Sequence, residues 1–441
     1  MKNHFLLNFF RNIFFIWIYV SSLIFSVYTL SDKWSYQKIE FHQQNIIIYI
    51  FIYLFSIIPL PFFKTKIEKP SDYVNLYLYF FTYIPSVVVP FFLRKTNSFE
   101  FEYIIYLIVL TLSIIYLLKN NTRKFLILNS LKPLNKNFFF FLIFLIYSIS
   151  TISFITSFGL KFNIPSFSEI YDIREEYKEV TRGNIITRYL VGWIGYILNI
   201  FLFIYGLSKR NKFLIIFTII FQIYIFSLMA LKSHLATFIL AYILYLYFKK
   251  YNKIRFNLFL FLLSTSVILF SILDLIIGED IFQTLVIRRI MIVPSQLSYF
   301  HFEFFIHNEK TYWAYSFLKY INEYSYNTPP PNIIGNKYFN KPNMTAVVNF
   351  FIEGYTAFGY FGVIIVTIIF KKLMQIIDYI YVYKTNRSNL LIVSVLSITN
   401  IFNSTSIFTL ILTHGILILI IIYSITPFFN NKKKHEYSSH L

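Results

Sequence analysis

The 441-residue chain has no cysteine, and it is poor in glycine (11), proline (13) and acidic residues (20). The absence of cysteine excludes disulfides, thiolate metal sites and cysteine nucleophiles. Only 14% of the residues are charged, which is too few to cover the surface of a soluble protein of this length. The scarcity of glycine and proline also argues against a turn-rich, all-β fold.

The chain is rich instead in apolar and aromatic residues. Hydrophobic residues make up 57% of it and aromatic residues 22%. Tyr and Trp suit the two interfaces of a bilayer. The net charge is +20, but the basic residues are scattered in short runs between apolar spans, so we predict no nucleic-acid partner. We predict an all-α, polytopic integral membrane protein, a single membrane domain over residues 1–441.

Long apolar runs recur along the whole chain. About 20 apolar residues cross a hydrocarbon core of ~30 Å. By this measure we predict about twelve transmembrane helices, the first of which is expected to remain in the membrane as a signal anchor. The predicted spans lie near residues 9–30, 45–63, 73–93, 101–118, 137–156, 189–207, 213–230, 235–248, 257–277, 359–376, 389–403 and 407–428.

The basic residues predict the orientation. With both termini in the cytoplasm, the inside loops are richer in Lys and Arg than the outside loops, as the positive-inside rule requires. Two longer segments, about 158–188 and 278–357, then lie outside the cytoplasm. Any chemistry is expected on that outer face.

The first outside segment contains SEIYDIREEYKEVTRGNIITR, which predicts a short amphipathic helix. One interpretation is a solvated helix with opposite charges three residues apart, such as Glu179 and Arg182. The other is a phosphate site formed by Arg174, Arg182 and Arg188, because guanidinium groups bind diphosphate oxygens through paired hydrogen bonds. The tight connection Leu231-Lys232-Ser233-His234 lies at the same face, and is either a plain hairpin or part of a site.

The second outside segment carries Arg288 and Arg289, followed by His301 and Glu303. Arg289, His301 and Glu303 are candidates for one polar site, although His301 and Glu303 are two residues apart and would not share a helical face. Proline and polar residues over 329–341 predict a rigid loop. The stretch FFIEGYTAFGYFGVII then enters the tenth span, with glycines suited to close helix packing.

No metal site is predicted. The HExxH signature is absent. Asp274, Glu279 and Asp280 form the weaker alternative, an acidic group that could hold a cation.

The pattern resembles the Wzy family, the polymerases of O-antigen and capsule repeat units. RRIMIVPSQLSYFHFEFF is similar to the family's Arg, Pro and aromatic approach to its second outside loop, and IEGYTAFGYFGVII to its Glu-Gly entry into a late span. LKSHLATFILAYILY stands where members often have a Gly-Ser/Thr-Arg-Ser helix start, with Lys232 and His234 in place of the usual Arg. The resemblance covers about residues 140–425.

The resemblance implies a membrane glycosyltransferase at the outer face of a bacterial inner membrane, active in polysaccharide biosynthesis for lipopolysaccharide O-antigen or capsule. Its substrate would be a polyprenyl-diphosphate-linked oligosaccharide within the membrane lipid, with no cofactor. The resemblance also suggests two further partners, a chain-length regulator and a flippase of the same pathway.

Such a reaction needs cations to neutralise the leaving diphosphate and a base for the acceptor hydroxyl. The candidate bases are Glu353, Glu176 and His301. The candidate diphosphate ligands are Arg174, Arg182, Arg188, Arg288, Arg289 and Lys232.

Two other functions remain open. An O-antigen ligase, or another lipid-linked glycosyltransferase of similar topology, also has a large outside loop. A flippase or transporter of the same lipid-linked glycan is the alternative from another class, although flippases usually have short loops and repeat symmetry.

Overall fold

The computed structural model describes residues 2–95, 100–122, 125, 128, 130–162, 166, 169–251, 253–320, 323–384, 387–399 and 405–427. These residues are almost wholly helical, and two short strands, β1 (Lys66–Ile67) and β2 (Ile254–Arg255), pair antiparallel. The prediction of an all-α membrane protein is confirmed.

The helices are α1 (Lys2–Trp34), α2 (Ile46–Ile57), α3 (Pro70–Leu78), α4 (Ile84–Phe92), α5 (Phe101–Leu118), α7 (Lys136–Phe158), α8 (Ile170–Gly183), α9 (Ile185–Trp193), α10 (Asn199–Lys209), α11 (Lys212–Met229), α12 (Lys232–Lys250), α13 (Phe256–Ile277), α14 (Val293–His307), α15 (Pro330–Phe339), α16 (Phe350–Tyr383), α17 (Arg387–Thr399), α18 (Ile407–Ile411) and α19 (Ile416–Ile425). Three segments are π-helical, namely η3 (Tyr79–Tyr83), η4 (Ile194–Leu198) and η5 (Gln283–Ile292). Single 3-10 turns lie at η1 (Ser35–Gln37), η2 (Leu60–Phe62) and η6 (Phe317–Tyr320).

Within the described residues, nine helical segments are long and apolar enough to cross a membrane. Two shorter apolar segments, Ile46–Phe62 and Ser388–Thr399, and helix α12 overlap the remaining predicted spans. Every predicted span therefore overlaps a helix, although residues 400–403 of the eleventh span and residue 428 of the twelfth lie outside the described residues.

The outermost helices show why the chain requires a bilayer. On α7, Phe144 is 70% exposed and Ile152 is 64% exposed, and on α13 Leu275 is 63% exposed. Apolar surface of this extent is unfavourable in water and favourable against lipid chains. In both helices the backbone N–H and C=O groups form hydrogen bonds within the helix, as spanning segments require.

Segments predicted to lie inside gather on one face of the bundle, here called the β1 face. The loops before α3 and before α13 are joined by β1 and β2. The Ser71 hydroxyl and the Asn120 amide both donate to the Asp378 carboxylate, at 2.6 and 3.0 Å. This buried carboxylate therefore links α3, the end of α5 and α16.

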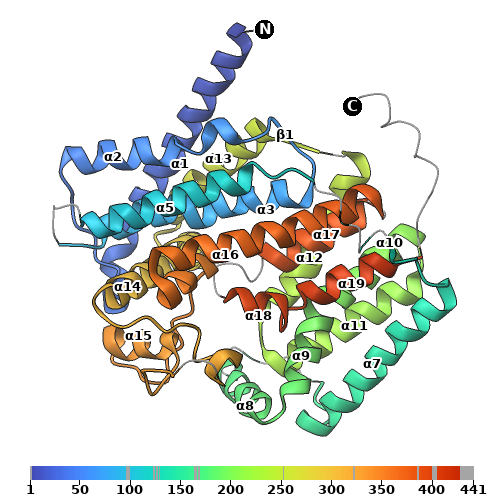
Figure 1. The fold of residues 1–441 in the computed structure, drawn as a ribbon. Coiled ribbons are helices and arrows are strands. Elements are labelled where there is room, and N and C mark those ends of the chain that lie inside the picture. The colour runs from blue at the N-terminus through green and yellow to red at the C-terminus, as the bar shows by residue number, and fades with distance from the viewer. Residues whose placement is uncertain are drawn as a thin grey trace.

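Segments predicted to lie outside gather on the opposite face, here called the α8 face. The His42 amide donates to the Phe92 carbonyl at 2.8 Å, and the Gln296 side chain to the Lys38 carbonyl at 2.7 Å. In Figure 1, α14, α15 and α8 lie along the left and lower side, whereas β1 lies at the upper right. The two groups of loops are thus separated as the charge pattern predicts.

The second predicted outside segment begins as a packed helix. η5 and α14 form one helical stretch that packs against α1, α4, α13 and α16. The Met291 sulfur lies 3.3 Å from the Tyr19 hydroxyl of α1, and Met291 is 1% exposed. The first third of this segment therefore belongs to the bundle.

The predicted loop over 329–341 is wrong, because α15 occupies most of it. Pro330 is the first residue of this helix, where its missing N–H would have no helical partner in any case. The prolines therefore begin a helix here and do not form a loop.

Helix α16 consists of two helical parts that meet at Phe358 and Gly359. Gly359 has φ 63° and ψ −146°, a conformation that glycine adopts without strain. After this reversal Gly354 and Gly362 touch: a Cβ on Gly362 would lie 1.8 Å from the Gly354 carbonyl oxygen. The predicted close packing by these glycines is confirmed, and it orients Glu353 beside the reversal.

We expect Gly362→Ala to destabilise the protein by about 2 kcal/mol or more, because the added methyl meets backbone that cannot move aside. Thermal unfolding in detergent measures the effect. Gly183→Ala is the control, since a Cβ there meets nothing within 4 Å. Equal melting temperatures for Gly362→Ala and wild type would contradict the close contact.

Candidate functional site

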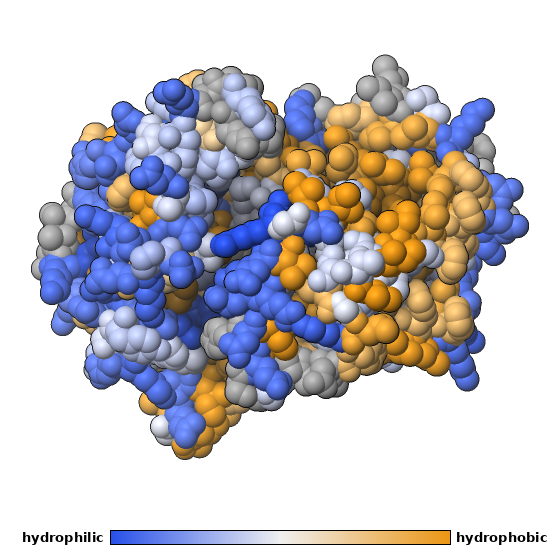
Figure 2. Space-filling model, turned by 90° about the horizontal axis from the view of Figure 1, so that it is seen from below, coloured by the Kyte–Doolittle hydropathy of each residue, from blue (hydrophilic) through white to orange (hydrophobic). Residues whose placement is uncertain are grey.

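The α8 face carries the arginines of the predicted phosphate helix. α8 confirms the predicted amphipathic helix and packs against α9 and α11. Seen from below, hydrophilic side chains cover one half of the molecule and hydrophobic side chains the other (Figure 2). The surface between the halves is hollowed, and strongly hydrophilic side chains border the hollow.

Arg174 is positioned by the end of α11. Its Nε and Nη2 atoms donate to the Ala230 carbonyl at 3.3 and 3.0 Å. Ala230 has φ 50° and ends α11, where the carbonyl groups lack helical partners and favour a cation. Lys232 follows two residues later and is exposed. Arg174 and Lys232, distant in sequence, are therefore placed at the same turn.

Arg182 and Arg188 are exposed and lie at the junction of α8 and α9. Burial raises the pKa of Tyr177, and the nearby positive charge of Arg188 partly opposes that rise. The Tyr177 ring stacks on Phe158 at 5.9 Å. Arg182 lies in the last turn of α8 and Arg188 in the first turn of α9, so both lie near the end of α8.

Acidic residues do not neutralise these arginines. Glu176, one of the candidate bases, is paired with Lys161. Among the described residues no ion pair includes Arg174, Arg182 or Arg188. The interpretation of α8 as a helix held by opposite charges is therefore not supported at Arg182.

Two histidines and a tyrosine lie next to the α11–α12 turn. The Tyr196 ring lies 4.5 Å from the His234 ring and 5.3 Å from the His414 ring. His234 Nε2 and His414 Nδ1 are buried and have no hydrogen-bond partner. Sequence reasoning marked His234 as part of a polar turn but missed Tyr196 and His414. A polar residue within an apolar span is the available signal for His414.

His414 lies in a break between α18 and α19. The Trp193 indole donates to the Leu412 carbonyl at 2.7 Å. A Cβ on Gly192 would lie 2.2 Å from the Thr413 carbonyl oxygen, so the break packs directly on α9. Irregular backbone at membrane depth is tolerated where protein covers it.

Glu353 lies at the other end of α18. Its Oε1 atom accepts a hydrogen bond from the Tyr315 hydroxyl at 2.8 Å, and its Oε2 atom is buried without a partner. The Trp313 side chain and the Ile407 amide also face this carboxylate. Glu353 is 7% exposed, and no described lysine or arginine forms an ion pair with it.

His301 is held inside the protein. Its Nε2 atom lies 2.9 Å from the Ala346 carbonyl, so Nε2 carries the proton, because a carbonyl only accepts. Burial lowers the pKa of His301 to about 4, and this hydrogen bond opposes the shift. His301 is 1% exposed and links α14 to the segment before α16.

Arg288 and Arg289 belong to a different group of elements. η5 packs against α1 and α13, whereas α8 packs against α9 and α11. Arg288 Nη1 donates to the Gln37 Oε1 atom at 2.8 Å, and Arg289 is exposed. His301 and Glu303 have different partners, because His301 contacts the Ala346 carbonyl while Glu303 faces Tyr338.

One charged cluster on this face was missed. Arg94 is 8% exposed and pairs with Glu100. The Tyr299 hydroxyl donates to the Glu100 carboxylate at 3.0 Å, and the Arg94 guanidinium lies 5.0 Å from the Tyr299 ring centroid. This cluster is neutralised internally and ties α4 and α5 to α14.

The acidic residues near the ninth span have structural partners. The Asp274 carboxylate accepts from the Phe282 and Gln283 amides at 2.9 and 2.7 Å, so it caps η5. Asp280 pairs with Lys33 at 3.5 Å. Within the part of the chain that the structure describes, no three His, Cys, Asp or Glu side chains gather as metal ligands.

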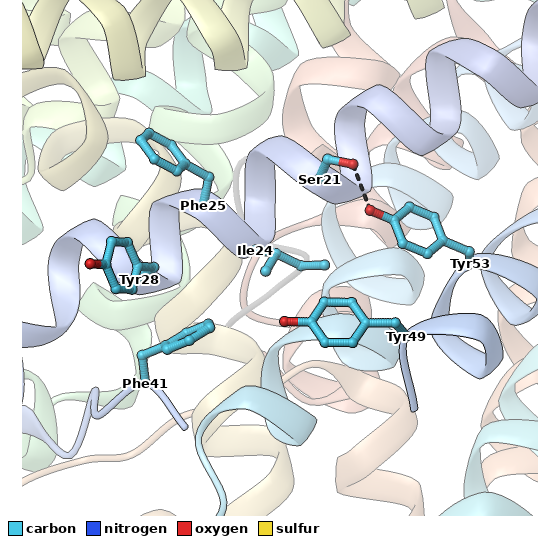
Figure 3. Close-up of a pocket in the computed structure, with 7 residues that line it drawn as sticks. All are labelled: Ser21, Ile24, Phe25, Tyr28, Phe41, Tyr49 and Tyr53. Carbon is cyan, nitrogen blue, oxygen red and sulfur yellow. Dashed lines mark hydrogen bonds between the residues drawn. The ribbon is translucent and has the colours of Figure 1, made fainter. Parts of the chain in front are cut away.

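A groove between α1 and α2 is lined by apolar and aromatic side chains. Figure 3 shows the rings of Tyr28, Phe41 and Tyr49 around it, with a 2.6 Å hydrogen bond between Ser21 and Tyr53. No charged side chain lines it. The groove is therefore unsuited to a diphosphate.

Comparisons with protein-family models, curated proteins and solved structures found no match to this chain.

We expect the stability of the purified protein to fall between pH 6.5 and about 4, partly because of His301. The unfolded chain takes up a proton below about pH 6.5, whereas folded His301 stays neutral until about pH 4. The contribution of His301 to the free energy of unfolding is complete above pH 6.5. Below pH 6.5 this contribution falls by up to about 1.4 kcal/mol per pH unit. His301→Gln should flatten this dependence in chemical unfolding, and His307→Gln, at an exposed position, should not. An unchanged slope for His301→Gln would contradict the buried neutral histidine.

Proposed function

We propose that this chain is an oligosaccharide repeat-unit polymerase, a glycosyltransferase of a bacterial inner membrane. It would use polyprenyl-diphosphate-linked repeat units at the outer face, with twelve spans and both termini in the cytoplasm. The observation that carries the proposal is the group of cations around α8, in which Arg174 is fixed at the α11–α12 turn. The local resemblance to the Wzy family supplies the reaction.

The reaction makes one bond and breaks one. The oxygen of an acceptor sugar hydroxyl attacks the anomeric carbon of the donor glycan, and the bond from that carbon to the diphosphate oxygen breaks. The hydroxyl proton passes to a base, and polyprenyl diphosphate leaves with the electron pair. Negative charge therefore grows on the diphosphate, which cations held in advance stabilise most effectively.

Arg174, Arg182, Arg188 and Lys232 are the diphosphate ligands in this proposal. The arginines suit the task because no described carboxylate pairs with them, so their charge is available to a ligand. Arg174 is also held by a carbonyl, which leaves the positive charge of its guanidinium uncompensated. Arg288 and Arg289 are left out of this group because η5 packs elsewhere.

Glu353 is the proposed base. Its Oε1 atom is oriented by Tyr315, and its Oε2 atom, which has no hydrogen-bond partner although Trp313 and the Ile407 amide face the carboxylate, is the oxygen proposed to accept the proton. Glu176 is less suited to act as the base because Lys161 already pairs with it. His301 is also less suited, because it is enclosed by α14 and Ala346. α18 begins at Ile407, whose amide faces Glu353, and ends before the break that holds His414.

One feature favours the alternative of a flippase. The α18–α19 break is a discontinuous helix within the last span, and transporters use such breaks at their substrate sites. The cations would then bind the same lipid-linked diphosphate without breaking a bond. An O-antigen ligase shares the leaving group as well, so the product separates the three functions.

Arg174→Ala should lower polymerisation by about 10²–10³-fold, and Arg174→Lys should give an intermediate rate, since it keeps the charge but loses the guanidinium geometry. The measurement is the chain length of the surface glycan in a deletion strain that expresses each variant. The Arg174→Ala strain should display single repeat units, because flipping and ligation continue.

Lys209→Ala is the matched control, since Lys209 is an exposed cation at the end of α10, away from α8. Normal-length polymer from Arg174→Ala at normal protein level would refute the role of the α8 cations. Failure of the deletion strain to expose any lipid-linked unit at the outer face would identify a flippase instead.

A further inference from the structure

Arg288 is a buried cation without a counter-charge. Its side chain is 5% exposed, and among the described residues no carboxylate forms an ion pair with it. Nη1 donates to Gln37, but Nε has no hydrogen-bond partner. The guanidinium carbon lies 3.6 Å from the ring centroid of Trp34, which covers one side of the cation. Burying a guanidinium in this way costs free energy unless an anion binds to it.

Two further groups beside Arg288 lack partners. The Trp34 indole nitrogen is buried without an acceptor, and so is the Thr284 hydroxyl, one helical turn before Arg288. An indole N–H only donates, and a hydroxyl donates readily. An acceptor would satisfy all three groups, and beside a guanidinium an anionic acceptor is the most favourable one.

The surrounding charges favour the same conclusion. Burial and the neighbouring Arg289 both lower the pKa of Arg288, and Tyr36 partly opposes that shift. The nearest acid on this stretch, Asp280, is already paired with Lys33. The anion must therefore come from outside the described chain.

We propose that Arg288, Trp34 and Thr284 form a binding site for a phosphate group, separate from the α8 cations and independent of the polymerase activity. A guanidinium matches two phosphate oxygens at once, and indole and hydroxyl donors fit the remaining acceptors. Trp34 ends α1 on the α8 face, a position typical of tryptophan at a bilayer interface. The phosphate belongs either to the head group of an anionic phospholipid or to free phosphate.

The test uses the full-length protein purified in detergent and two probes. Native mass spectrometry measures retention of phosphatidylglycerol, and thermal unfolding measures stabilisation by inorganic phosphate. Arg288→Ala should weaken binding of the effective probe by about ten- to a hundredfold, as loss of a charged hydrogen bond predicts. Retention of phosphatidylglycerol alone identifies a lipid head group, whereas stabilisation by phosphate alone identifies the free anion.

Two milder variants keep the test decisive if Arg288→Ala does not fold. Trp34→Phe keeps an aromatic ring under the cation but removes the indole donor, and Thr284→Val removes the hydroxyl. Each should weaken binding several-fold, while Lys337→Ala, at an exposed cation of α15, should leave it unchanged. Equal binding of both probes by wild type and by these variants would overturn the site, as would the absence of binding to wild type.

Discussion

The bilayer imposes the constraint on which the rest of this structure depends: every backbone polar group within the hydrocarbon must find a partner in the protein. The chain meets it with continuous helices at its outer surface, such as α7 and α13. Its irregular segments are covered by other parts of the chain. The Thr311 amide donates to the Thr356 carbonyl, at the end of the first part of α16, at 3.0 Å. The break before α19 is likewise covered, by α9.

These covered irregular segments hold the polar side chains of the candidate site. Glu353 lies just before the reversal in α16, and His414 lies in the α18–α19 break. A side chain on a regular, lipid-facing helix could not be presented in this way without exposing polar groups to hydrocarbon. Fold and candidate chemistry are therefore coupled through the same few glycines, above all Gly354 and Gly362.

Both faces carry ion pairs between described residues. On the β1 face, Lys64 pairs with Asp72 at 2.7 Å, and Asp378 accepts from Ser71 and Asn120. In such pairs each polar or charged group has its partner within the protein, and the pairs contribute to structure. On the α8 face Arg94 pairs with Glu100, whereas among the described residues no acid pairs with the arginines of α8 and its junction with α9, or with the buried Arg288. Cations without an acidic partner suit an anionic, lipid-linked ligand.

Much of the fold was predictable because hydropathy reports the bilayer directly. The spans and α8 follow from apolar length and amphipathic spacing. η5 and α14 were missed as part of the bundle because their composition resembles an interfacial loop, and α15 because proline at a helix start looks like a loop signal. Within the site, Arg174 and Lys232 were identified individually, but their meeting at Ala230 depends on tertiary packing. The contact of Tyr196 with His414 joins distant segments and leaves no local pattern.

The measurement that tests the central claim most directly is the sidedness of the α8 face. Because the chain has no cysteine, single cysteines report their own accessibility without background. We chose Lys178 on α8 and Asn336 on α15 for one face, and Lys66 and Arg210 for the other, since all four positions are exposed. In intact cells a membrane-impermeant maleimide should label cysteines at Lys178 and Asn336, and should label those at Lys66 and Arg210 only after the membrane is permeabilised. Labelling of position 66 or 210 in intact cells, or protection of position 178, would contradict an outward-facing α8 site.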